Sequence, residues 1–243
     1  MGKILCLDTA TTICSVSLSE AGRLISFEES SDKNLHASRL TLFIEEVLKT
    51  ASLSMNELDA IAVSMGPGSY TGLRIGVASA KGLCYALDIP LIAIPTLQAM
   101  ALGMRELALP LASSPGKENE TPGWGLCPMV DARRMEVFCA IFDQELNLTR
   151  DTAAEIIHSD SFSEFMAEKL LFFAGDGAEK CRELLESNKN AIFIQGFRHS
   201  SRFMIRLAEE KLTRREFENL AYFEPFYLKD FIAGKPRVKA LTS

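Results

Sequence analysis

The order of hydrophobic segments in residues 1–100 leaves few architectures open. Short apolar or alternating runs at 3–8, 13–19 and 23–28 predict three strands joined by tight turns. Apolar residues then recur at helical spacing from Leu40 to Leu48. The chain is therefore expected to open with a β-meander that is followed by an amphipathic helix.

A strand–turn–helix unit comes next. An apolar run at 60–65 ends in the sequence Gly-Pro-Gly, and residues 71–87 place apolar side chains on one helical face. Pro90 ends that helix, and 91–94 is the next strand candidate. The whole order, three strands, helix, strand, helix and strand, is typical of a ribonuclease-H-like half domain of the α/β class.

The rest of the chain repeats this order in weaker form. One helix is indicated at 162–169, and the strand candidates are 127–130, 135–142, 170–174 and 191–195. The segment 112–125 is rich in Ser, Pro, Gly and charge, which predicts an exposed loop. We therefore predict an N-terminal ribonuclease-H-like half at residues 1–100, and a smaller C-terminal half at 101–243 with a loop insertion at 112–125.

Charge and cysteine content limit the possible functions. The net charge of −6 and the pI of about 5.3 disfavour unaided binding of RNA, because RNA is a polyanion. The six cysteines are scattered without a C-x-x-C pair, so we expect them to be reduced and buried. The first apolar run is too short for a signal-peptide core or a membrane span, which predicts a cytoplasmic protein without a membrane anchor.

The densest motif is GPGSYTGLRIG at residues 66–76. Its glycines permit close approach of the backbone, and Ser69 or Thr71 can cap the following helix, as in a phosphate-binding loop. The motif lacks the lysine of a Walker A loop and does not match G-x-G-x-x-G. An equally good interpretation is that the glycines let the helix dock tightly on its own sheet.

Two other segments could approach a nucleotide. Asp8 and Thr9 follow the first strand, where a carboxylate and a hydroxyl could contact a metal ion and phosphates; a hydroxyl-rich hairpin turn is the alternative. Gly175, Asp176 and Gly177 join a strand to a helix and could approach a ribose or a phosphate. The second motif is common in isolation.

The catalytic motifs of hydrolases are missing from the sequence. No G-x-S-x-G occurs, and the three histidines lie far apart without a partnered serine or cysteine pattern. His36 is more typical of a surface or interface residue than of a metal ligand, because a metal site needs further ligands. We predict no metal and no cofactor.

Several segments resemble the TsaB (YeaZ) family of tRNA threonylcarbamoyladenosine biosynthesis proteins. In the first half these are LDTATTICSVSL, HASRLTLFIEEVLK and AVSMGPGSYTGLRIGVASAKGLCYALDIPLIAIPTLQAMA. Weaker similarity continues in VDARRMEVFCAIF, FFAGDGAEK and EPFYLKDF, where Lys229 replaces the arginine of the family. The resemblance covers nearly the whole chain except the 112–125 loop.

The resemblance implies an actin-like ATPase fold of two ribonuclease-H-like halves, and a complex with a TsaD-type catalytic paralogue and a TsaE-type ATPase. TsaD-type relatives carry a His-x-x-x-His metal motif where this chain has Thr96 and Met100, so both imidazoles are replaced. Their second glycine-rich phosphate hairpin is replaced by residues 131–134, Asp-Ala-Arg-Arg, whose aspartate repels a phosphate. The resemblance therefore implies a non-catalytic subunit with vestigial nucleotide loops at Asp8, Thr9 and 175–177.

The resemblance also implies where a partner would bind. Family members are expected to pair through the helices at 36–50 and 71–87, where a stripe of small residues would allow close approach of a partner helix. The alternative is that this stripe packs only on the chain's own sheet. The predicted interface comprises His36, Arg39, Leu42, Ser69, Tyr70, Gly72, Arg74, Gly76, Ala80 and Lys81.

Three functions follow from these observations. The first is a non-catalytic partner that activates a TsaD-type enzyme, with tRNA bound only by the complex and a homodimer formed when the chain is alone. The second is an autonomous actin-fold ATPase or phosphotransferase that uses Asp8 and Asp176 around a magnesium nucleotide. The third is a peptidase, which the missing metal motif and triad disfavour.

Overall fold

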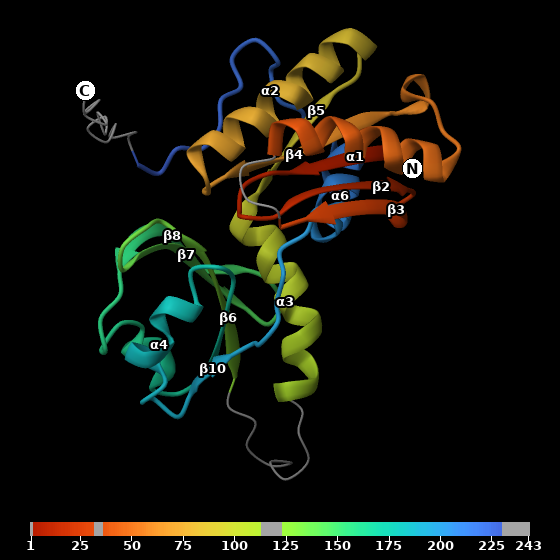
Figure 1. Ribbon diagram of the computed structural model, residues 1–243. Helices are drawn as coiled ribbons and strands as arrows, with labels where there is room; N and C mark the ends of the chain where they lie inside the picture. The colour runs from red at the N-terminus through yellow and green to blue at the C-terminus, as the bar shows by residue number, and fades with distance from the viewer. Residues whose placement is uncertain (1, 32–35, 113–122, 230–243) are drawn as a thin grey trace, which may run out of the picture.

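The computed structural model describes residues 2–31, 36–112 and 123–229, and it contains two five-stranded sheets (Figure 1). In the first sheet, β1 (Lys3–Asp8), β2 (Cys14–Glu20) and β3 (Arg23–Ser30) form an antiparallel meander. The strands β4 (Ala60–Gly66) and β5 (Leu91–Pro95) add in parallel, which gives the order β3-β2-β1-β4-β5. The predicted order of the first half is confirmed.

Helices cover both faces of this sheet because strand residues point alternately to its two sides. On one face, Leu5 and Leu7 pack with α1 (His36–Ala51) and α2 (Tyr70–Leu87); the 3-10 turn η1 (Met55–Glu57) lies between these helices in the sequence. On the other face, Ile4 and Cys6 pack against α6 (Ile205–Arg214), which follows the 3-10 turn η3 (Ser201–Met204).

The second sheet repeats the order of the first. The strands β6 (Trp124–Asp131), β7 (Glu136–Asp143) and β8 (Leu148–Ile156) are antiparallel, while β9 (Leu170–Ala174) and β10 (Ala191–Phe193) add in parallel. Within the described ranges, one face carries only short elements, namely α4 (Ser163–Met166), η2 (Glu179–Cys181) and α5 (Arg182–Leu185). The other face is covered by α3 (Thr96–Ala112).

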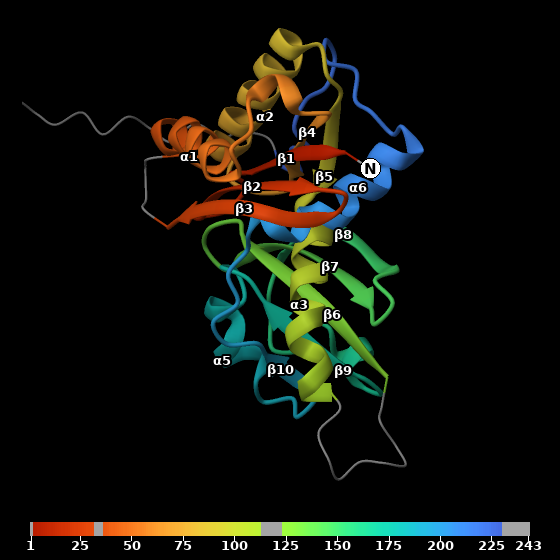
Figure 2. The same cartoon turned by 90° about the vertical axis from the view of Figure 1, so that its right-hand side faces the viewer.

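The helices that follow the two sheets are exchanged between the halves. Helix α3 follows β5 but packs mainly on β6, and α6 follows β10 but packs on β5 and β1. Both views show α3 running from the first sheet down along the second (Figures 1 and 2). This exchange means that each half is completed by a helix that follows the other half's sheet, and the predicted domain division at residue 100 stays a prediction.

The helices α3 and α6, the strand β8 and the 3-10 turn η3 had no counterpart among the predicted elements. The expected burial of the cysteines is confirmed. The six cysteines all lie in the described part of the chain, where they are buried and form no disulfide. Among the described residues, none of the helices combines the length and hydropathy needed to cross a bilayer. The proposed loop at 112–125 falls mostly outside the described residues.

Candidate functional site

Asp8 ends the central strand of the first sheet and is buried, with 1 % of its surface exposed. One carboxylate oxygen, Oδ1, accepts a hydrogen bond from the backbone N–H of Ala10 at 3.0 Å, and the other, Oδ2, lies 2.6 Å from Nε2 of His199. Burial raises the pKa of Asp8, but the charge and hydrogen bond of His199 outweigh it and hold the pKa below its usual value. Both oxygens of this carboxylate are therefore already engaged by the protein.

His199 comes from the segment between β10 and η3, far from Asp8 in the sequence. It is 4 % exposed, and its ring stacks near Phe203 with centroids 6.4 Å apart. With the carboxylate ionised, Nε2–H donates to Asp8, and Nδ1 has no hydrogen-bond partner among the described residues. A contact between residues this far apart had no signal in the sequence.

The glycine-rich run is packed against the turn after β1. Ser69 caps α2 by accepting a hydrogen bond from the N–H of Gly72 at 3.3 Å, while the Ser69 N–H donates to the carbonyl of Ala10 at 2.7 Å. The hydroxyl of Thr9 donates to the carbonyl of Gly72 at 2.7 Å. A side-chain carbon at Gly68 or Gly72 would collide with the backbone of Ala10 or Thr9. The glycines thus serve tight docking, the second of the two interpretations.

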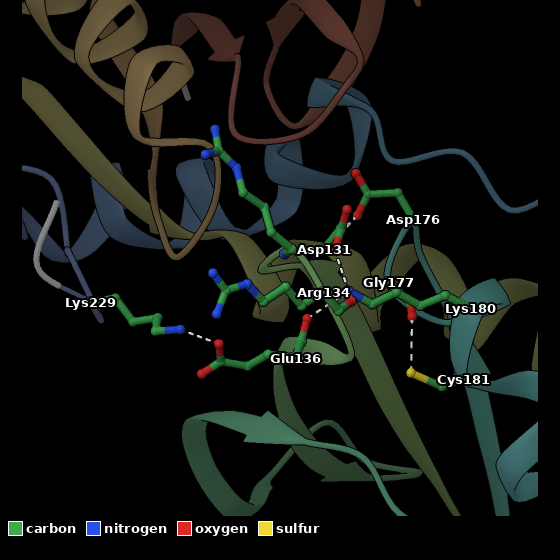
Figure 3. A network of polar contacts seen from close by, with 9 residues as sticks. Asp131, Arg134, Glu136, Asp176, Gly177, Lys180, Cys181 and Lys229 are labelled. Carbon is green, nitrogen blue, oxygen red and sulfur yellow. Dashed lines mark hydrogen bonds and ion pairs between the residues drawn. The ribbon is translucent and has the colours of Figure 1, made fainter. Parts of the chain in front are cut away.

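The second half places a polar network at the matching position (Figure 3). Asp131 ends β6, and its N–H donates to Oδ1 of Asp176 at 2.9 Å. Lys180 contacts the Asp131 carboxylate, and its Nζ also donates to the carbonyls of Arg134 and Glu136, each at 2.7 Å. The ammonium group of Lys180 therefore holds the hairpin between β6 and β7 in place.

Asp176 connects this network to the first half. Its carboxylate accepts the backbone N–H of Thr12, which lies in the turn after β1. Burial raises the pKa of Asp176; the Asp131 N–H lowers it and the Asp131 carboxylate raises it, so the pKa lies above its usual value. Gly175 precedes it at φ +111°, and a side chain there would meet the carbonyl of Met129. The loops at Asp8 and at 175–177 therefore meet at the junction of the halves.

These residues do not fit a magnesium nucleotide. A metal ion would need a free carboxylate at Asp8, whose oxygens face Ala10 and His199. Phosphates at the second hairpin would face the Asp131 carboxylate, which is paired with Lys180. The positions of the family's metal motif hold Thr96, whose hydroxyl lies 3.1 Å from that of Ser64, and the buried Met100.

The predicted interface separates into buried and exposed residues. Gly72, Gly76 and Ala80 are buried on the inner face of α2, and a side-chain carbon at Gly76 would collide with Thr9. The expectation that this small-residue stripe meets a partner is corrected: it lets α2 lie close to β1 and β4 of its own sheet.

Other predicted interface residues lie at the surface. Leu42 is 48 % exposed on α1, and both Ser69, the N-cap of α2, and Arg74 on α2 are exposed. The guanidinium of Arg74 lies 5.5 Å from the ring centroid of Tyr70, and the Tyr70 ring packs at a tilt against Tyr227 with centroids 4.9 Å apart. This group is therefore held in place by ring contacts.

Two of the remaining three predicted residues are less open. Lys81 is half-buried and donates to the carbonyl of Phe223 at 3.0 Å. Arg39 is half-buried, and the side chain of His36, the first residue of α1, lies outside the described part of the structure.

The outer face of α2 offers a second small-residue stripe that the sequence analysis missed. Ala78 is exposed, and a side-chain carbon at Gly82 would meet nothing within 4 Å. Tyr85 follows on the same face and is 84 % exposed. These residues fall at i, i+4 and i+7, so the spacing relative to the buried residues could have revealed them.

Comparisons with known proteins place the chain in a family. The family model described as TsaD: tRNA N6-adenosine threonylcarbamoyltransferase matches residues 28–235. The tRNA threonylcarbamoyladenosine biosynthesis protein TsaB of Haemophilus influenzae is 29 % identical over 242 residues, 96 % of this chain and 95 % of that protein. The TsaB protein of Escherichia coli is 38 % identical over 145 residues, 60 % of this chain and 57 % of that protein.

Solved structures agree with these matches. YeaZ from Pseudomonas aeruginosa superposes with a TM-score of 0.75 and 26 % identity, over 94 % of this chain and all of that one. A second structure from the same organism, described as similar to peptidase YEAZ, gives the same TM-score at 25 % identity. The shared α/β fold is the actin-like arrangement of two ribonuclease-H-like halves, of which the second is reduced. Sequence and structure together show that this chain belongs to the TsaB (YeaZ) family.

Proposed function

We propose that this chain is a non-catalytic subunit required for N6-threonylcarbamoyladenosine modification of tRNAs that read codons beginning with adenine. It binds and activates a TsaD-type threonylcarbamoyltransferase together with a TsaE-type ATPase. The names of the relatives in Haemophilus influenzae and Escherichia coli support the pathway, and the TsaD family model over residues 28–235 supports a shared ancestry with the catalytic paralogue. The acidic chain contacts tRNA only through the complex.

The buried pair of Asp8 and His199 carries the non-catalytic assignment. A carboxylate that is held by an imidazole at 2.6 Å and by a backbone N–H is not available to a metal ion. Asp8, Thr9 and residues 175–177 are thus vestigial nucleotide loops that now join the halves. The autonomous ATPase is less well supported for the same reason, and a peptidase is disfavoured because His199 is too buried to reach a peptide.

The outer face of α2 and the exposed part of α1 are the surface that we assign to the paralogue. Ala78 and Gly82 allow a partner helix to approach closely, while Leu42, Arg74 and Tyr85 supply apolar and polar contact around them. Arg39, Ser69, Tyr70 and Lys81 border this surface. The same face would form the homodimer of the free chain.

Reconstitution of tRNA modification tests this function. The TsaD-type and TsaE-type proteins are combined with tRNA, ATP and threonylcarbamoyl-adenylate, with and without this chain, and the modified nucleoside is measured by mass spectrometry. We expect product only when the chain is present. Product that forms equally well without it would reject the proposal, and magnesium-dependent ATP turnover by the chain alone would favour the ATPase.

A pair of variants locates the interface. Ala78→Trp adds bulk to the outer face of α2 and is expected to abolish co-elution with the paralogue and product formation while leaving the fold intact. Ala167→Trp is the matched control, because Ala167 is exposed at the end of α4 in the second half. Full activity of Ala78→Trp would exclude this face of α2 as the interface.

A further inference from the structure

A groove of about 330 Å³ lies on the opposite side of the first sheet from α1 and α2. It is bounded by the turn between β2 and β3, by α3, and by the start of α6, elements that lie together in Figure 2. Its volume is at the lower end of the range of ligand sites in proteins. Because it lies on the other side of the sheet, the groove is separate from the surface that we assign to the paralogue.

The walls of the groove carry positive charge on an acidic chain. Arg105, Arg202 and Arg206 line it, with Glu106 as the one carboxylate among its lining residues. The chain as a whole has a net charge of −6. A local excess of cations on an acidic protein favours an anionic occupant, because the potential near the groove differs from that of the remaining surface.

Arg105 is the residue least satisfied by its own chain. Its guanidinium makes no ion pair or hydrogen bond with any residue that the structure describes, and Nε is buried without an acceptor. A buried donor that lacks an acceptor destabilises the protein. Arg105 lines the groove and is only partly buried as a residue, so a carboxylate in the groove can pair with its guanidinium, which binds carboxylates in a two-pronged geometry.

Arg202 and Arg206 are positioned but not neutralised. The guanidinium of Arg202 stacks 4.4 Å from the ring centroid of Phe27, and its nearest carboxylate, Glu29, is 3.9 Å away. Arg206 is half-exposed and lies 3.7 Å from Glu210. Ion pairs this long and this exposed are weak, so both groups remain able to bind an added anion.

The apolar part of the groove favours a peptide over a nucleic acid as its occupant. Leu24 and Leu109 are 42 % and 44 % exposed at its edge, where they can receive an aliphatic side chain. The ring of Phe203 stacks on Phe197 at 5.7 Å and near His199 at 6.4 Å, so it offers little free face for a base. Single-stranded RNA binding depends on such stacking.

We propose that this groove binds an acidic segment of a partner protein that also carries leucine-type side chains. Carboxylates of the segment pair with Arg105 and Arg206, and an aliphatic side chain packs between Leu24 and Leu109. The groove lies between the two exchanged segments, since α3 leads into the second sheet and α6 follows it. An occupant would thus contact elements that belong to both halves.

Fluorescence anisotropy with a labelled synthetic peptide of alternating leucine and glutamate tests the proposal. The peptide is expected to bind the full chain, and Arg105→Gln should weaken binding about tenfold, since charge-assisted hydrogen bonds are lost. Arg206→Gln should act in the same direction, and because Arg206 is at the surface it keeps the test valid if Arg105→Gln fails to fold. Arg214→Gln, at the exposed far end of α6, is the control and should change nothing.

Altered peptides complete the test. Replacing glutamate by glutamine, or leucine by serine, should each abolish binding, and added salt should weaken it. The proposal is overturned if the glutamine peptide binds as well, if Arg105→Gln and Arg206→Gln bind normally, or if single-stranded RNA binds the groove more tightly than the peptide. Because the groove and α2 lie on opposite sides of the sheet, a negative result here leaves the reconstitution of tRNA modification unaffected.

Discussion

The two halves of the molecule share one strand order but use different helices. The first sheet runs β3-β2-β1-β4-β5 and the second β8-β7-β6-β9-β10. The first is covered on one face by helices of 16 and 18 residues, whereas the same face of the second carries helices of four residues. The comparison shows that the sheet defines this fold, and that its covering helices can shorten.

The halves also treat their matching aspartates differently. Asp8 ends β1 and is buried against His199, whereas Asp131 ends β6 with 45 % of its side chain exposed and pairs with Lys180. A buried ion pair that loses one member leaves an uncompensated charge, while an exposed pair contributes little. The junction of the halves should therefore depend on the first aspartate far more than on the second.

The largest expected effect follows from this asymmetry. His199→Ala should lower the free energy of unfolding by about 3–5 kcal/mol, because it leaves the Asp8 carboxylate buried without its partner. Asp131→Asn removes the exposed ion pair of the second half and should cost less than about 1 kcal/mol. Chemical denaturation measures both values. Equal losses would mean that the two aspartates play equivalent roles.

Adding Asp8→Asn to His199→Ala removes the unpaired charge and should recover part of the lost free energy of unfolding. The pKa of Asp8 is lowered in the folded state, so its contribution is present above the unfolded value of about 3.9 and is lost as the pH falls through the folded value. The difference in the free energy of unfolding between the wild type and Asp8→Asn should therefore be largest at neutral pH and become smaller in acid.

A second prediction compares the glycines that follow β4 and β9. A side-chain carbon at Gly68 would overlap the Ala10 carbonyl, whereas one at Gly177 would lie 2.9 Å from the Val130 carbonyl carbon. We expect Gly68→Ala to cost about 3 kcal/mol and Gly177→Ala about 1–2 kcal/mol. Gly82→Ala, on the open face of α2, should instead stabilise the protein by about 0.5–1 kcal/mol. Thermal melting separates the three.

A third prediction asks which half opens first. Short helices cover one face of the second sheet, so we expect its local unfolding to precede that of the first. Burial raises the pKa of Cys6 and Cys84 to about 12, so native thiols should be unreactive. In urea below the midpoint, the second-half thiols should react about tenfold faster than the first-half thiols. The second-half set is Cys127, Cys139 and Cys181, and the first-half set is Cys6, Cys14 and Cys84.

Mass spectrometry of the modified peptides measures these rates, and full denaturation, where all six should react alike, is the control. Simultaneous reaction of both sets below the midpoint would mean that the exchange of α3 and α6 couples the halves into one cooperative unit.

The fold of the first half was readable from its sequence because its strands are short apolar or alternating runs bounded by turn residues, and its long helices each bury one regular face. Helix α3 was not, since its apolar residues serve two clusters: Leu97 and Met100 face the second sheet, and Ala99 faces the first. Strand β8 is an edge strand with few buried residues, and it lacks a clear alternation. Helix α6 is amphipathic and could have been found, but the sheet on which it packs is a tertiary property.

The site was readable only in part, for a similar reason. The sequence pointed to Asp8 and Asp176 because polar residues follow buried strands, but the group that faces a carboxylate depends on the fold. His199 is 191 positions away from Asp8. The small residues of α2 were identified correctly, yet their direction was not, because both faces of this helix carry small side chains.

The smallest expected effect concerns Asp176, the carboxylate that links the halves. Its pKa is raised, chiefly by burial and also by the Asp131 carboxylate, so the stability that it contributes is full below about pH 3.9 and is lost as the pH rises through the folded value. Asp176→Asn keeps an acceptor for the Asp131 N–H and removes the charge. The free energy of unfolding of the variant should therefore rise relative to that of the wild type as the pH rises from 4 to 7. This is the opposite of the trend expected for Asp8→Asn. Although neighbouring groups partly desolvate the carboxylate, the residue keeps an exposed surface where solvent screens its charge, so we expect a gain below about 1 kcal/mol in urea titrations at the two pH values. Parallel pH trends for the two variants would mean that both carboxylates are stabilised as anions, and that the halves differ less at their junction than the geometry of His199 implies.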